Sequence, residues 1–137
     1  MDVAVTKEEA LYQFWSGFGI PAIEENSVPS SGDKSPNFPY ISYQSVTDSF
    51  NNDVALSASI WDIDVIGQGD IPGHSALRFV SEKADEISRA IGRGGKVVGG
   101  IVWIRRGTPF AQNIRVEENN AIKRKYLNIT AEFLTAD

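Results

Sequence analysis

The sequence predicts an α+β fold, with a mostly antiparallel sheet and two main helices packed on one of its faces. Two stretches, around residues 7–18 and 77–91, carry apolar residues at helical spacing. The remaining ordered stretches are rich in β-branched and aromatic residues and are joined by short turns, which favours antiparallel neighbours. The chain has 137 residues with no internal repeat and no linker, so we expect a single domain over residues 1–137.

The first helix is marked at both ends. Thr6 and Glu9 have the spacing of a capping box, in which the Thr6 side chain accepts the amide hydrogen of residue 9. Gly17 and Gly19 follow, and glycine readily takes the left-handed conformation that ends a helix. The apolar face consists of Leu11, Phe14, Trp15 and Phe18. Residues 20–23 then predict a short edge strand.

The next part of the chain predicts a loop and a hairpin. Residues 24–38 are rich in Ser, Pro and Asn, which predicts a long exposed loop. Residues 39–48 and 54–64 predict two antiparallel strands. In the second strand the apolar positions shift from the Ile60 face to Trp61 and Ile63 on the other, which predicts either a bulge or burial of both faces.

The second helix is the clearest amphipathic element. His74 or Ser75 stands where a capping residue is needed, and Gly92 stands where a helix usually ends. The apolar positions are Leu77, Val80, Ala84, Ile87 and Ile91.

The last part of the chain predicts further strands. Residues 96–98 and 101–105 are expected to pair around a Gly-Gly turn. Residues 107–109 (GTP) are expected to break the chain, and residues 110–116 to pair only briefly. Residues 122–134 alternate well, so we expect one long strand there.

Composition excludes several classes of protein. There is no cysteine, which excludes disulfide frameworks, thiol nucleophiles and cysteine zinc sites. A net charge of −5 disfavours binding of a broad surface to the phosphate backbone of nucleic acid. The acidic, polar start of the chain does not resemble a signal peptide, and no apolar run reaches the ~20 residues that span a bilayer. We therefore expect no membrane association.

The charge is unevenly distributed. Residues 105–125 hold six basic and two acidic residues, a net charge of +4, so the rest of the chain carries −9. Such polarity suits self-association, in which a basic patch of one copy meets an acidic patch of the next. The alternative is a solvated strand end. The candidate interface residues are Arg105, Arg106, Arg115, Lys123, Arg124 and Lys125, together with Trp61.

The sequence holds no complete catalytic site. Asp62 and Asp64 share a strand face and, with Asp70, could hold Mg²⁺ or Mn²⁺, but such spacing is common by chance and a solvated strand end that runs into an acidic loop is the favoured explanation. The glycine run at residues 92–96 follows a helix, whereas a phosphate loop precedes one. His74 is the only histidine, and Ser75 adjoins it in the sequence. Neighbours on one backbone rarely meet in the geometry by which a histidine activates a nucleophile, so helix capping explains both residues better. We expect no catalytic residue, no bound metal and no cofactor, and we keep a metal-dependent enzyme as a remote alternative.

Four stretches together carry a resemblance to a known family. They read ALYQFWSGFGIPA at residues 10–22, PYISY at 39–43, WIRRGTPFAQ at 103–112 and RKYLNITAEFL at 124–134. In combination they resemble small neck or tail-completion proteins of tailed phages and of Gram-positive prophages. Within that group the chain looks most like a tail terminator of long-tailed, non-contractile phages.

The resemblance implies a structural role without catalysis or a cofactor. A tail terminator is an α+β domain that assembles as a ring, usually a hexamer, on the end of the tail tube. The ring stops tube polymerisation and forms the docking surface for the head. Its partners would be further copies of itself, the tail tube protein and the head–tail connector proteins, while DNA passes through without specific binding. The protein would lie in the virion tail or neck, and in the host cytoplasm during assembly. A head-closure or adaptor neck protein is the close alternative.

Overall fold

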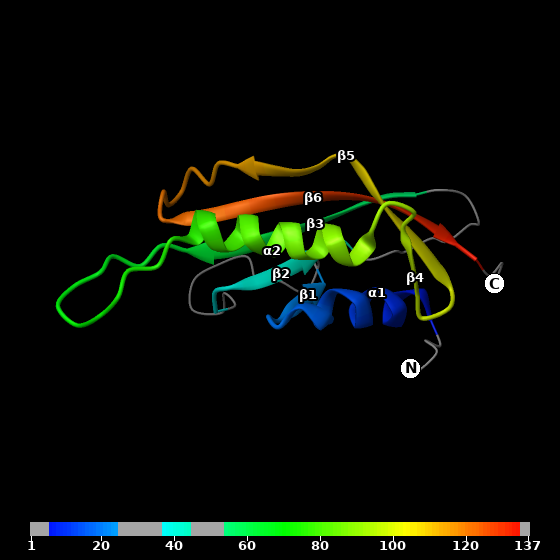
Figure 1. The fold of residues 1–137 in the computed structure, drawn as a ribbon, viewed down its shortest axis with the longest axis horizontal. Helices are drawn as coiled ribbons and strands as arrows, with labels where there is room; N and C mark the ends of the chain where they lie inside the picture. Colours follow the sequence, from blue (N-terminus) through cyan, green and yellow to red (C-terminus); the bar gives the residue numbers. More distant parts are fainter. Residues whose placement is uncertain (1–5, 25–36, 45–53, 135–137) are drawn as a thin grey trace.

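The fold is α+β, as the sequence predicts. The computed structural model describes residues 6–24, 37–44 and 54–134. The elements in order are α1 (Lys7–Trp15), η1 (Ser16–Phe18), β1 (Ala22–Glu24), β2 (Tyr40–Tyr43), β3 (Val54–Ile63), α2 (Ala76–Ile91), β4 (Lys96–Val98), β5 (Val102–Ile114) and β6 (Ile122–Phe133). The strands form one curled, six-stranded sheet in the order β1-β2-β3-β6-β5-β4, and both helices pack against it (Figure 1).

Every neighbouring pair of strands is antiparallel except β1 and β2, which run parallel. The predicted edge strand is therefore confirmed, with β1 shifted by one or two residues from residues 20–23. The predicted antiparallel pairing of the next two strands is also confirmed for β2, Tyr40–Tyr43, while residues 45–48 of the predicted strand lie outside the described residues. Most of the loop predicted at residues 24–38 lies outside the described residues.

The core lies between one face of the sheet and the two helices. Leu11 and Trp15 of α1 and Ile87 of α2 pack in one cluster with alternate residues of β2, β3, β5 and β6. The predicted alternation of the last strand is confirmed, because its inward apolar side chains from residue 127 onward are all nearly inaccessible to water. These are Leu127, Ile129, Ala131 and Phe133. We call the opposite face of the sheet the outer face.

The pairing of β3 with β6 tests the two explanations of the apolar shift in β3, a bulge or burial of both faces. β3 pairs with β6 without interruption from Val54 opposite Ala131 to Ile63 opposite Ile122, so β3 contains no bulge. Instead, residues on both faces of β3 are covered. Ile60 on the helix side is 0% exposed, and Ser59 on the outer face is 2% exposed. Trp61 and Ile63, to which the apolar positions shift, are partly buried on the outer face.

Both helices begin at the expected residues. Thr6 accepts the Glu9 amide hydrogen at 3.0 Å, and Gly19 has a positive φ of 82° just after η1. Ser75, not His74, caps α2 by accepting from the Arg78 amide. Leu77, which was expected on the buried face, is 44% exposed in the first turn of α2. None of the helices in the described part of the chain is long and apolar enough to cross a membrane.

The predicted break at residues 107–109 is wrong, because β5 runs through it. The pairing of β5 with β6 shifts register between Arg106 and Ala111. Such an irregularity accommodates Pro109, which has no amide hydrogen for the ladder. The Asn128 side chain of β6 donates to the Pro109 carbonyl at 3.0 Å, so the irregular segment stays attached to the sheet.

Candidate functional site

The most distinctive feature of the molecule is an arm, residues 64–74, between β3 and α2. Figure 1 shows it extending beyond the end of the sheet as a narrow loop. Val65 and His74 exchange two backbone hydrogen bonds, of 3.0 and 2.8 Å. Gln68 and Ile71 exchange two more, of 3.0 and 2.9 Å, nearer the tip. The arm is therefore an ordered hairpin.

The two strands of the arm lie very close together at its glycines. A Cβ atom added to Gly67 would lie only 3.0 Å from the Gly73 nitrogen. A side chain at Gly67 would therefore push the two strands apart. The glycines explain how so short a segment closes into a hairpin.

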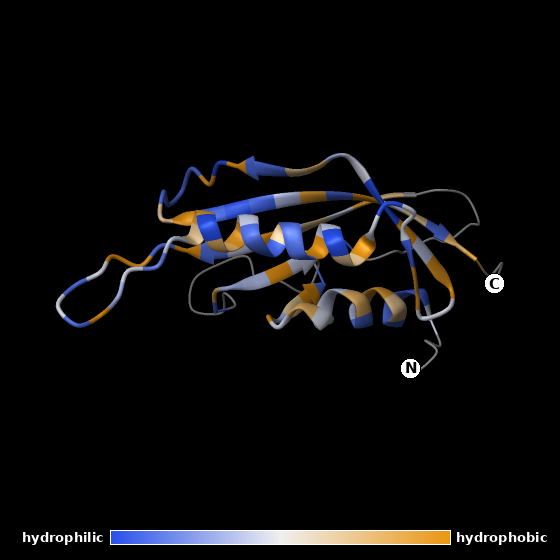
Figure 2. Cartoon of the chain, in the orientation of Figure 1, coloured by the Kyte–Doolittle hydropathy of each residue, from blue (hydrophilic) through white to orange (hydrophobic). Residues whose placement is uncertain are grey.

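The arm exposes apolar side chains. Ile66 is 88% exposed, Ile71 is 62% exposed and Val65 is 44% exposed. In Figure 2 the arm carries apolar segments that stand clear of the rest of the molecule. Single exposed apolar residues are common, but a cluster on a projecting, ordered element is typical of an interaction surface.

Two aspartates fasten the arm to the body. Asp62 is 2% exposed, and its Oδ2 atom lies 2.5 Å from Nε2 of His74 at the other end of the arm. Asp64 accepts from the Ala76 amide at 2.8 Å and lies 3.2 Å from the Lys123 ammonium. The hydrogen bond from Ala76, and then Lys123, lowers the pKa of Asp64 below its usual range, against the opposing effect of burial.

Asp70, the third residue of the remote metal-site alternative, does not lie beside Asp62 and Asp64. Asp70 lies in the turn between Gln68 and Ile71, at the tip of the arm, whereas Asp62 and Asp64 lie at its base. In the described ranges no three residues among His, Asp and Glu stand close enough together to hold a metal ion. The contacts of Asp62 and Asp64 instead support a structural role at the joint of arm and body.

The sheet divides the predicted basic stretch between its two faces. Lys123 and Lys125 stand opposite Asp62 and Ile60 in β3 and therefore lie on the helix side. Lys125 is within 3.5 Å of Ser81 on α2. Of the four arginines, Arg106 also lies on the helix side. Arg105 and Arg124 lie on the outer face. Arg115 is exposed just after the end of β5. No single basic patch contains all six, so their shared role at an interface stays a prediction.

Trp61 and Arg124 form a cluster on the outer face with Tyr40. The three residues occupy one row across β2, β3 and β6. The Tyr40 and Trp61 rings are stacked at 6.0 Å, and the Arg124 guanidinium lies 4.9 Å from the Trp61 ring. The Trp61 indole donates to Ser42, and Arg124 donates to Ser59. Burial raises the pKa of Tyr40, with Arg124 opposing, so its hydroxyl stays protonated.

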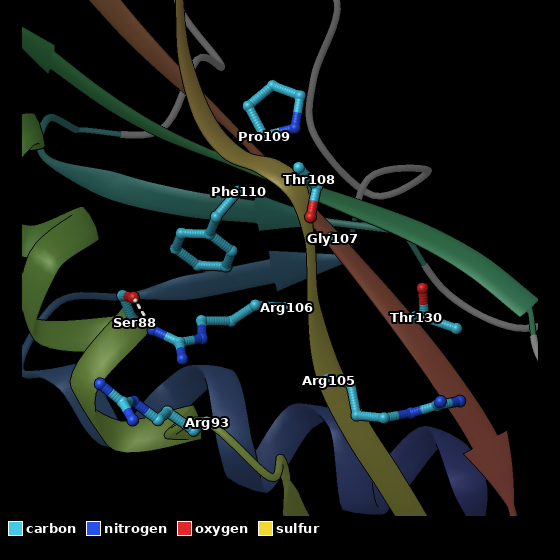
Figure 3. Close-up of a pocket in the computed structure, with 9 residues that line it drawn as sticks. All are labelled: Ser88, Arg93, Arg105, Arg106, Gly107, Thr108, Pro109, Phe110 and Thr130. Carbon is cyan, nitrogen blue, oxygen red and sulfur yellow. Dashed lines mark hydrogen bonds between the residues drawn. The ribbon is translucent and has the colours of Figure 1, made fainter.

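A pocket of about 500 Å³ lies where β5 is irregular (Figure 3). Its lining residues are Ser88, Arg93, Arg105, Arg106, Gly107, Thr108, Pro109, Phe110 and Thr130. The close-up shows Arg93 and Arg106 on the α2 side of β5 and Arg105 on the other side. Arg106 donates to Ser88 at 2.8 Å, and Arg105 lies 4.3 Å over the Trp103 ring. The arginines are thus spread around the pocket rather than aimed at one point.

A second pocket, of about 340 Å³, lies among the C-terminal end of α1, the end of α2 and β4. Its lining is mostly apolar and consists of Gln13, Phe14, Gly17, Phe18, Ala90, Lys96, Val97, Val98 and Gly99. Val97 is 49% exposed, while Phe14 and Phe18 are buried and form its deeper part. We call this the apolar pocket.

Sequence reasoning selected Trp61, Asp62 and Asp64 but missed Ile66 and Ile71. A usable signal was present, because two isoleucines in a segment rich in glycine have no core position to fill. Phe14 and Phe18 were assigned to the core, and only the structure shows that they also line a pocket.

No protein-family model matches this chain, and no curated protein or solved structure matches it either.

Proposed function

We propose that this protein is a structural subunit of a phage virion, a tail terminator that assembles as a ring on the end of the tail tube. The ring would end tube polymerisation and form the docking surface for the head. The observation that carries the proposal is the arm, which holds Ile66 and Ile71 away from the body. A cluster of exposed apolar side chains on an ordered, projecting element supports burial of that element against another protein.

The uneven charge supports self-assembly. A ring needs two different, complementary faces on each copy, because each copy contacts two neighbours. Residues 105–125 carry +4 and the rest of the chain −9, so such faces can be built from one sequence. Arg115 is exposed and Lys123 is partly exposed, and both remain accessible to an acidic neighbour.

The proposal assigns partners and a location but no reaction. The partners are further copies of the chain, the tail tube protein and the head–tail connector proteins. DNA would pass through the ring without specific binding, as suits an acidic chain. The protein would lie in the virion tail or neck, and in the host cytoplasm during assembly. No cofactor is assigned.

The first test is the mass of the protein in solution, by light scattering after gel filtration, across a concentration series at low and high salt. We expect assemblies larger than a monomer that loosen as salt screens the charged contacts. The second readout is the length of tail tubes polymerised from the same phage's tube protein in its presence. Tubes should become shorter than with an unrelated acidic protein of similar size.

A protein that leaves tube length unchanged and binds the connector instead would replace the terminator role with the head-closure or adaptor role. A protein that stays monomeric and binds neither tube nor connector would contradict the proposed function.

A further inference from the structure

We propose that the arm of one copy inserts Ile66 and Ile71 into the apolar pocket of the next copy. This contact rests on the self-assembly stated above and identifies the two surfaces that would make it. The arm and the pocket belong to the same chain, so each copy would give an arm to one neighbour and receive an arm from the other.

The arm cannot fill the pocket of its own chain. The arm ends at His74, directly before Ser75, the cap of α2, whereas Ala90 in the pocket lies at the other end of that helix. A helix of 16 residues spans about 24 Å. Figure 1 shows the arm extending away from β4, which forms one wall of the pocket. The contact can therefore form only between copies.

The two surfaces are chemically complementary. The arm offers Ile66 and Ile71, and the pocket offers aromatic and aliphatic walls, including the half-exposed Val97. Both surfaces leave apolar area in water in the single chain, and the contact would remove both from water at once. Asp70 stands beside Ile71 at the tip, and Lys96 stands on the rim of the pocket. Both are exposed, so opposite charges meet if the tip enters the pocket.

The arm is also prepared for binding. Its four backbone hydrogen bonds and the contact between Asp62 and His74 fix the position of Ile66 and Ile71 before any partner arrives. A pre-ordered element loses less conformational entropy on binding than a flexible one. A mobile loop with the same side chains would lose more conformational entropy on binding.

The contact joins two different surfaces, so it is heterologous. Heterologous contacts repeat from copy to copy and form a ring when the rotation closes, or an open filament when it does not. The arm contact alone therefore generates a chain of copies with one orientation, which is the arrangement that a terminator ring requires.

The test is disulfide trapping, for which this chain is well suited because it has no cysteine of its own. The double variant Ile66→Cys/Val97→Cys is oxidised mildly and separated without reductant. We expect a ladder of covalently linked copies that ends at the ring size. The matched control is Ile66→Cys/Asp85→Cys, since Asp85 is exposed on α2 but lies outside the pocket. It should give far fewer links.

A noncovalent readout uses Ile66→Ser in the otherwise unchanged chain. We expect association to weaken roughly ten- to hundredfold, as when one large apolar side chain is no longer buried. Circular dichroism should show an unchanged fold.

The outcomes separate this contact from the proposed function. Self-association of the wild type without excess linking of positions 66 and 97 would overturn the arm contact and leave the ring intact. Linking of positions 66 and 97 into open filaments would support the arm contact and contradict the terminator ring. A wild type that does not associate at high concentration, together with an Ile66→Cys/Val97→Cys variant that does not link, would overturn the arm contact.

Discussion

Strand β3 and the arm that follows it place the same residue type in opposite surroundings. Ile60 in β3 is 0% exposed and belongs to the core cluster, which contains residues of both helices and five strands. Ile66, six positions later, is 88% exposed. The hydropathy of the two residues is identical, so composition alone cannot separate them. The difference is the position of the backbone, inside the sheet for Ile60 and beyond its end for Ile66.

The two regions are also stabilised by different interactions. The body is held by apolar burial between the sheet and the helices, the dominant favourable contribution to folding. The arm has no such core, and it is held by its paired backbone groups and by the contacts of Asp62 and Asp64 at its base. Apolar side chains on the arm are thus not needed for the fold of the single chain, which leaves them available to a partner.

The largest expected effect comes from truncating one isoleucine in each region. Ile60→Ala should lower the free energy of unfolding by roughly 2–5 kcal/mol, because it leaves a cavity in a fully packed core. Ile66→Ala should change it by less than about 0.5 kcal/mol, since the side chain is already in water. The measurement is denaturant unfolding at concentrations where the protein is monomeric. Similar losses in both variants would show that the arm packs against the body and would remove the distinction.

The body of the fold was predictable from sequence because its periodicity reports burial directly. The alternation of β6 and the helical spacing of α2 each predicted an element close to its observed bounds. The continuation of β5 through Pro109 was not predictable, because it depends on Asn128 in a strand distant in sequence. Local turn chemistry predicts a break at such a proline, and only the neighbouring strand overrides it.

The candidate site was predictable only in part. The sequence identified the two aspartates before the arm, but it could not show that His74, twelve residues beyond Asp62, returns to it. The sequence also predicted the basic stretch at residues 105–125, but not that its side chains are divided between the two faces of the sheet. That division follows from strand alternation once β6 is paired with β3, because Lys123 and Arg124 must point in opposite directions.

The next largest loss of stability is expected at Asp62, whose contact with His74 joins the two ends of the arm. Asp62→Asn keeps the shape of the side chain but removes the charge that faces His74 in a buried position. We expect a loss of about 1–3 kcal/mol, typical of a disrupted buried polar pair. The loss should appear first in the arm, as faster hydrogen exchange at the Val65 and His74 amides, about tenfold for each 1.4 kcal/mol.

Asp85→Asn, which changes an exposed carboxylate in the middle of α2, is the matched control and should leave the exchange of the arm amides unchanged. If Asp62→Asn leaves arm exchange at the wild-type rate, Asp62 does not fasten the arm, which is then held by its backbone bonds and by Asp64.

The smallest expected effect is a pH dependence at the other fastening point, Asp64. Its folded-state pKa lies below the usual value because the Ala76 amide and the Lys123 ammonium favour the ionised carboxylate. The stabilisation is therefore complete above the unfolded pKa of about 4 and is lost as the pH falls through the lower, folded value. Asp64→Asn should be less stable than the wild type at pH 7, and the two unfolding curves should converge in acid. The Asp64 side chain is 35% exposed, so solvent screening keeps the difference in stability below about 1 kcal/mol.

Lys123→Met should remove only part of this stabilisation, since the Ala76 hydrogen bond to Asp64 remains. A difference between the wild type and Asp64→Asn that persists unchanged at low pH would mean that the carboxylate acts through its shape, not its charge, and that only Asp62 couples the arm electrostatically to the body.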